Sequence, residues 1–151
     1  MKRIIKILGV GCAFAFVIVA FLFGWMLKHD PSVKENITVL NFEQSGQQLF
    51  VKTKVWGVAG NHEEIVLSKD PNGVANKEED CIFYTSEIFY RIEGEDSLIL
   101  YAPENLASIP PSKNTSVTLV LHDLPTAGEL EDMRRNYKSY GLEMVSVYSQ
   151  D

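Results

Sequence analysis

Hydrophobic positions are spread unevenly along the chain, and the longest apolar run comes first. Residues 7–27, from Ile7 to Leu27, form a run of 21 positions without an ionisable side chain. A helix of about 20 apolar residues can cross the roughly 30 Å hydrocarbon core of a bilayer. The pattern therefore predicts one transmembrane helix, inside an N-terminal anchor that covers residues 1–28.

Basic residues around this run predict its orientation. Lys2, Arg3 and Lys6 precede the run, whereas Lys28 alone follows it directly. Because basic residues favour the cytoplasmic side, we expect a cytoplasmic N-terminus and a C-terminal domain that is periplasmic or extracellular. Two alternatives stay open: a secretory signal that is cleaved, or a lipid attached to Cys12 after cleavage. Each interpretation places the remaining residues outside the cytoplasm.

Beyond a polar linker over residues 29–36, the pattern changes to short β-branched or alternating segments that are separated by turn residues. Such segments are typical of β-strands, in which side chains point alternately to the two faces. Strands are predicted over residues 37–42, 49–58, 63–68, 81–84, 87–92, 98–102, 116–121 and 142–148. Residues 103–115 contain three prolines, so we expect them to cross between the sheets without pairing in either.

The first hairpin of this pattern has a specific predicted register. Along residues 49–58, the β-branched side is expected to face the core and the side that carries the lysines to face water. Gly60 followed by Asn61 is a preferred pair for a two-residue hairpin turn. Such a turn would place Trp56 directly opposite Ile65 on the next strand.

One segment follows a helical period instead. Over residues 126–140, apolar residues recur on one helix face: Leu130, Met133, Tyr137 and Tyr140. Thr126 and Glu129 form a capping box at the start of this segment, and Gly141 is suited to end the helix. The pattern as a whole predicts a mainly β fold: one antiparallel β-sandwich-like domain over residues 37–151, with the helix before the last strand.

Acidic residues are confined to the part after the apolar run, and this narrows the classes of partner. The chain has a formal net charge of −6, with 20 acidic and 14 basic residues. Four of the basic residues, up to and including Lys28, flank the apolar run, so the part of the chain after Lys28 carries a formal net charge of −10. Phosphate backbones repel such a domain, which excludes nucleic acids as expected partners. We expect two partners, the lipid bilayer through residues 7–27 and an unidentified envelope protein.

The cysteines offer the domain no internal disulfide. Cys12 lies in the apolar run, and Cys81 is the only cysteine after it. The domain must therefore be stabilised by its hydrophobic core. Because Cys81 precedes an apolar strand segment, we expect a buried thiol, with a reactive nucleophile and a disulfide-linked dimer as the alternatives.

The most site-like cluster is a histidine followed by two carboxylates. His62, Glu63 and Glu64 offer ligands for a metal ion or groups for proton transfer. A helical zinc motif would need a second histidine at position 66, where Val66 stands. His122 supplies a second imidazole if the fold brings it close to His62. This pair defines one alternative function, a small metal-dependent hydrolase. Apart from it we expect no catalytic residue, metal site or cofactor.

Aromatic residues of the strands indicate a binding surface instead. Along a strand, about half of such residues face the core and the rest reach the surface. The candidate binding surface comprises Trp56, His62, Glu63, Tyr84, Tyr90 and Tyr101. Its surface tyrosines define a second alternative function, a glycan-binding module in which the rings form a platform for a sugar.

Three segments resemble a known class of protein. They are residues 55–68 (VWGVAGNHEEIVLS), residues 89–92 (FYRI) and residues 98–101 (LILY). In these segments the chain resembles small, exported, membrane-anchored bacterial envelope proteins of unknown function. The resemblance implies no activity and no site residues. We therefore expect a non-catalytic, membrane-anchored exported domain that takes part in protein–protein interaction or envelope assembly.

Overall fold

The computed structural model describes residues 34–43, 45–57, 62–110 and 116–148, together with Ile18, Val19 and Phe21, which are helical. The chain divides into two compact units, Met1–Pro31 and Ser32–Asp151. No helix among the described residues is long and apolar enough to cross a bilayer. Most of the apolar run, including Cys12, lies outside the described residues, so the transmembrane helix and its orientation stay predictions.

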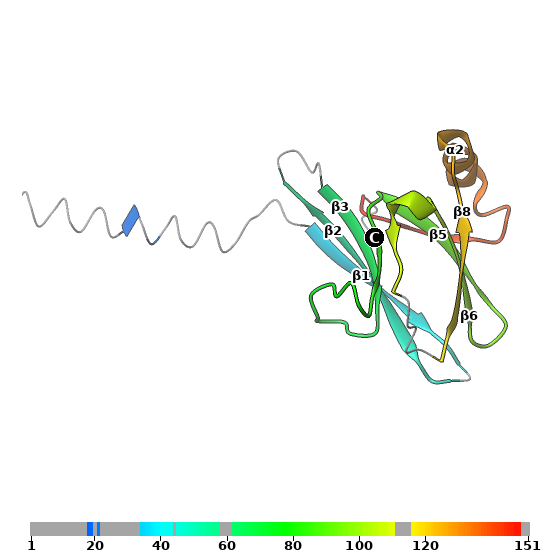
Figure 1. Ribbon diagram of the computed structural model, residues 1–151, viewed down its shortest axis with the longest axis horizontal. Helices are drawn as coiled ribbons and strands as arrows, with labels where there is room; N and C mark the ends of the chain where they lie inside the picture. Colours follow the sequence, from blue (N-terminus) through cyan, green and yellow to red (C-terminus); the bar gives the residue numbers. More distant parts are fainter. Residues whose placement is uncertain are drawn as a thin grey trace, which may run out of the picture. The chain divides into compact units, whose positions relative to one another are not determined.

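The unit that begins at Ser32 is mainly β, as the sequence predicts, and its described residues form two sheets and one α-helix (Figure 1). Among the described residues, sheet A has five strands in the order β1 (Lys34–Asn41), β2 (Gln48–Trp56), β3 (His62–Ser68), β4 (Cys81–Phe83) and β7 (Ala107–Ser108). Sheet B has four described strands in the order β8 (Thr118–Asp123), β6 (Ser97–Ala102), β5 (Glu87–Glu93) and β9 (Glu143–Ser146). The arrangement is a β-sandwich-like domain.

Side chains from both sheets form one core between them. The β-branched side of β2 points inward, as its alternation predicts, and Val51 is 1% exposed. The other members of this core include Leu40, Leu49, Val55, Ile65, Leu67, Phe83, Ile88, Leu98, Leu100, Val117 and Val145. Cys81 is buried in the same core, which confirms the expected buried thiol. Each fully buried side chain of this size contributes roughly 1.5–3 kcal/mol, so the core stabilises the domain.

The predicted register of the first hairpin is wrong. Trp56 lies opposite His62, and Ile65 lies opposite Thr53. The connection between β2 and β3 therefore spans residues 57–61, of which 58–61 lie outside the described residues. A two-residue turn would have placed Ile65 on the same face as Trp56, outside the core. The observed register buries Ile65 between the sheets, and this burial outweighs the local preference for a tight turn.

Sheet B is mixed and not purely antiparallel, because β8 pairs with β6 in parallel. Between these strands the chain forms a short 3₁₀ helix, η2 (Glu104–Leu106), and then β7, which adds to β4 at the edge of sheet A. The expectation that residues 103–115 pair with neither sheet is therefore wrong for β7. Its two residues are followed by Ile109 and Pro110, and a proline cannot donate to a sheet. The excursion to sheet A brings β8 back alongside β6 in the same direction.

The predicted helix is present as α2 (Ala127–Asn136) and lies outside sheet B (Figure 1). Its capping box is confirmed: the Glu129 backbone N–H donates to Thr126 Oγ1 over 3.2 Å, and the Thr126 N–H donates to Glu129 Oε2 over 3.1 Å. The helix ends four residues earlier than predicted, and a turn with φ +69° at Gly141 leads to β9. Its Leu130 and Met133, with Tyr137 at its C-terminal end, pack in a second cluster whose other members are Phe89, Tyr101, Leu124, Leu142 and Met144.

Candidate functional site

The outer face of sheet A, which points away from sheet B, carries polar and aromatic strand residues. The alternation that buries one side of β2 sends Lys52, Lys54 and Trp56 to this face. On β3, Glu64 lies opposite Lys54 and His62 lies opposite Trp56, so both share the face. These residues are not needed in the core, which leaves them available for other interactions.

A loop over residues 69–80 lies against part of this face (Figure 1). The Lys52 ammonium holds it by donating to the backbone carbonyl oxygens of Asp70 (2.9 Å) and Gly73 (2.8 Å). Loop residues then enclose a groove of about 340 Å³ against Ile37 of β1 and its neighbours on β2 and β3. We call this the Ile37 groove. The loop thus gives sheet A a partial cover.

A more open hollow lies at the end of the same face, where β2 ends and β3 begins. It has a volume of about 480 Å³ and is lined by Trp56, His62, Glu63, Glu64 and Tyr84. The Trp56 and His62 rings stack, with centroids 5.5 Å apart and planes inclined by 20°. Tyr84 follows β4 directly and is 42% exposed. We call this site the Trp56 hollow.

Two carboxylates give the Trp56 hollow a negative character. Tyr148 lies after the end of β9, and its hydroxyl group donates a hydrogen bond to the Glu63 carboxylate. This hydrogen bond raises the pKa of Tyr148 above its ordinary value of 10.0. Among the described residues, neither Glu63 nor Glu64 forms an ion pair.

Lysines lie at the aromatic rings of the hollow. Lys54 Nζ is 5.9 Å from the centroid of the Trp56 ring, and it forms an ion pair with Glu35 over 2.9 Å. Lys77 Nζ, from the loop over residues 69–80, is 6.0 Å from the centroid of the Tyr84 ring. Both distances fall within the range of a cation–π interaction.

The structure brings four of the six candidate surface residues together in the Trp56 hollow: Trp56, His62, Glu63 and Tyr84. Tyr90 is not at the surface, because it shares the inward side of β5 with Ile88 and is 8% exposed. Burial, and then the charge of Glu143, raise the pKa of Tyr90. Tyr101 lies on the outer face of sheet B, where its ring stacks on His122 at 4.9 Å. These two tyrosines belong to other parts of the molecule.

From the sequence, Glu64 is a candidate only for metal binding or proton transfer, and Tyr148 is not a candidate site residue. Tyr148 lies 85 positions from Glu63 in the chain, so no local pattern connects them. The alternation along β3 was the available signal for Glu64, since it places this residue on the same face as His62.

The two histidines of the hydrolase alternative do not share a site. His62 lies on the outer face of sheet A, whereas His122 stacks on Tyr101 on the outer face of sheet B. The core between the sheets separates these faces. The described part of the chain contains no group of three or more His, Cys, Asp or Glu side chains that could hold a metal ion.

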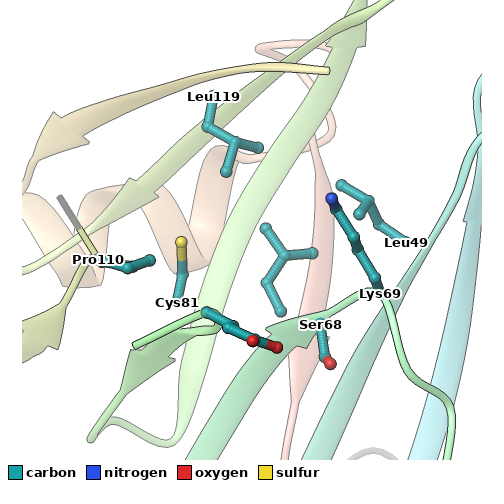
Figure 2. A pocket seen from close by; sticks show the side chains of 8 residues that line it. Leu49, Ser68, Lys69, Cys81, Pro110 and Leu119 are labelled. Carbon is teal, nitrogen blue, oxygen red and sulfur yellow. The ribbon is translucent and has the colours of Figure 1, made fainter. Parts of the chain in front are cut away.

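A small pocket opens between the sheets beside Cys81 (Figure 2). Its volume is about 20 Å³, and it is lined by Leu49, Leu67, Ser68, Lys69, Glu79, Cys81, Pro110 and Leu119. A cavity of this size holds about one water molecule. It is a packing gap and not a ligand site.

Comparisons of the chain with protein-family models, with curated proteins and with solved structures find no match. The site must therefore be interpreted from its own residues.

Proposed function

We propose that this protein is a non-catalytic, membrane-anchored, exported domain that binds another protein through the outer face of sheet A. The observation that carries the proposal is the Trp56 hollow. It gathers partly exposed aromatic rings from β2, from β3 and from the residue after β4, together with two carboxylates of β3, around an open volume of about 480 Å³. Residues 7–27 are proposed as its membrane anchor, with the N-terminus in the cytoplasm.

The composition of the hollow supports protein binding. Tryptophan and tyrosine are enriched among the residues that contribute most to protein–protein interfaces, because they bury a large area at a small entropic cost. Trp56 and Tyr84 lie close enough to line one hollow, and both remain outside the core. A partner that covered these two rings would remove from water the apolar area that the fold leaves exposed, and this burial would stabilise the complex.

The geometry gives less support to the two alternatives. A hydrolase that uses His62 and His122 together would need both imidazoles in one cleft, whereas they lie on different sheets. A glycan platform of tyrosines would need exposed rings, whereas Tyr90 is buried and Tyr101 is stacked on His122. Protein binding requires neither arrangement.

Site-specific photo-crosslinking of the full chain in its native membrane tests the proposal. A photoreactive phenylalanine analogue in place of Tyr84 should yield one defined crosslinked partner. The same analogue in place of Val120, which is 38% exposed on sheet B, is the matched control and should yield no such product. Equal products from both positions, or none from Tyr84, would contradict the proposal.

A reporter fused after Asp151 tests the topology separately. The basic residues before the apolar run predict activity only outside the cytoplasm. Reporter activity inside the cytoplasm would overturn the exported orientation, whatever the crosslinking result.

A further inference from the structure

We infer that the Trp56 hollow binds a lysine or arginine side chain on an extended segment of the partner, an inference that rests on the proposed function. The segment's neighbouring apolar side chain lies in the Ile37 groove. The ligand is thus defined by its chemistry: a cation that stacks on rings and pairs with carboxylates, followed by an apolar group.

The lining of the hollow combines two features that favour a cation. Ammonium and guanidinium groups are attracted to the faces of tryptophan and tyrosine rings, with tryptophan the stronger partner. Trp56 and Tyr84 supply such rings at opposite ends of the lining, on β2 and after β4. Glu63 and Glu64 supply acceptors for charge-assisted hydrogen bonds, which are stronger than neutral ones.

The domain's own lysines are independent evidence that these rings attract cations. Lys54 and Lys77 reach the Trp56 and Tyr84 rings from different elements, β2 and the loop over residues 69–80. Lys54 is also paired with Glu35, so its charge is compensated within the sheet. A partner cation would take the place of one of these ammonium groups at a ring face.

The charge balance favours a basic segment over an acidic one. Glu63 and Glu64 line the hollow itself, and Lys54 at its edge is already paired with Glu35. The part of the chain after residue 28 carries a formal net charge of −10. Such a field attracts basic segments and repels acidic ones during encounter.

The adjoining Ile37 groove determines which kind of side chain neighbours the basic residue on the bound segment. The Trp56 hollow and the Ile37 groove share Glu64 in their linings, so they form one continuous surface. Ile37 is 48% exposed and Val74, on the rim of the groove, is 93% exposed. An extended segment places alternate side chains on one face, which matches a basic residue followed by an apolar one at the second position.

Binding of defined heptapeptides to the full chain in nanodiscs tests the inference. The peptides share leucine at the second position on either side of a central residue, which is lysine, arginine, glutamine or glutamate. The Trp56 indole N–H signal in NMR spectra reports binding at the hollow. We expect the lysine and arginine peptides to bind at least about fivefold more tightly than the glutamine peptide, and the glutamate peptide most weakly. Equal affinities, or tightest binding of the glutamate peptide, would overturn the inference.

Variants identify the groups that select the cation. Glu64→Gln should weaken the lysine peptide about threefold and reduce its salt dependence, because it removes one carboxylate. Tyr84→Leu should weaken it by about two- to fivefold through loss of the ring face. Glu95→Gln, in the exposed turn between β5 and β6, is the matched charge control and should change nothing. Equal effects of the Glu64 and Glu95 variants would contradict the assigned site.

Two outcomes separate this inference from the proposed function and from a lipid ligand. If the photo-crosslinked partner at Tyr84 is obtained but its capture is insensitive to Glu64→Gln and salt, protein binding stands and the cation specificity fails. If the Trp56 signal shifts when phosphatidylethanolamine replaces phosphatidylglycerol in the nanodisc, and does not shift with any peptide, the cation belongs to a lipid and the peptide proposal is overturned.

Discussion

The outer faces of the two sheets are covered in different ways. On sheet B, α2 packs against Phe89, and Arg134 reaches down to the Glu87 carboxylate. On sheet A, one loop lies over part of the face and is held by Lys52, while the end beside Trp56 stays open. A helix buries a continuous apolar stripe, whereas a loop of polar residues cannot. We infer that the helix-covered face serves stability and the open face serves recognition.

Aromatic truncation on the two faces should give the largest difference. Phe89→Ala removes a side chain that is 0% exposed beneath α2, so the free energy of unfolding should fall by about 3–5 kcal/mol. Trp56→Ala removes a partly exposed ring, and the loss should be about 1 kcal/mol. Denaturant unfolding of the full chain in detergent, followed by circular dichroism, measures both. Similar losses would mean that the two faces are equally important for stability.

The ion pair beneath α2 should give the next largest effect. Arg134 Nε donates to Glu87 Oε1 over 2.8 Å; the Glu87 side chain is 7% exposed and that of Arg134 is 46% exposed. This hydrogen bond also raises the pKa of Arg134. Arg134→Met leaves Glu87 charged and buried, which should lower the free energy of unfolding by about 2 kcal/mol. This is less than the roughly 3–5 kcal/mol that is lost when a fully buried pair is broken.

Arg135 provides the matched control for that prediction. It pairs with Glu131 on the exposed side of α2, so Arg135→Met should change stability by less than about 0.5 kcal/mol. Adding Glu87→Gln to Arg134→Met should restore part of the loss, because it removes the unpaired charge. If Arg134→Met and Arg135→Met lower the free energy of unfolding in urea by equal amounts, the ion pair between Arg134 and Glu87 is unimportant for stability.

The loop on sheet A should be a weaker cover than α2. Lys52→Met removes two hydrogen bonds to backbone carbonyl groups of the loop, which should cost about 1 kcal/mol. Amide hydrogen exchange should accelerate across residues 69–80 and remain unchanged in α2. Lys69→Met, at the exposed start of the loop, is the control and should leave exchange as it is. Unchanged exchange in the Lys52 variant would show that other contacts hold the loop.

Alkaline titration should distinguish Tyr90 in the core from Tyr148 at the open face. Of the effects predicted here, this one should change stability least at neutral pH. Burial raises the pKa of Tyr90, and the hydrogen bond to Glu63 raises that of Tyr148. Because the folded state holds these protons more tightly, their contribution to stability is complete below about pH 10 and is lost as the pH rises through the folded pKa.

Glu63→Gln distinguishes the two causes. It should return the pKa of Tyr148 toward its ordinary value and leave Tyr90 unchanged, as followed by tyrosinate absorbance with Tyr90→Phe and Tyr148→Phe to assign the signals. A shift of Tyr90 in the Glu63 variant would contradict the separation of the core from the hollow.

Elements that depend on neighbouring residues are predictable from the sequence alone. Alternation assigned the inward side of β2, including Val51, because a strand repeats every two residues. The pair Thr126 and Glu129 located the start of α2, because a capping box is closed within four residues. The position of Cys81 before an apolar segment predicted its burial. Each of these features is encoded in a few consecutive side chains.

Features that connect residues far apart in the chain depend on how the two sheets pack. The β2–β3 register followed from burial of Ile65 between sheets and not from the local turn preference at Gly60. Tyr84 and Tyr90 lie in similar sequence surroundings, yet their positions differ. Tyr84 lines the hollow on the outer face of sheet A, whereas Tyr90 is on the inward side of β5 and lies in the core. Tyr148 reaches Glu63 only because the fold brings the residues after β9 close to β3. Such contacts come from the packing of whole sheets, which local patterns do not record.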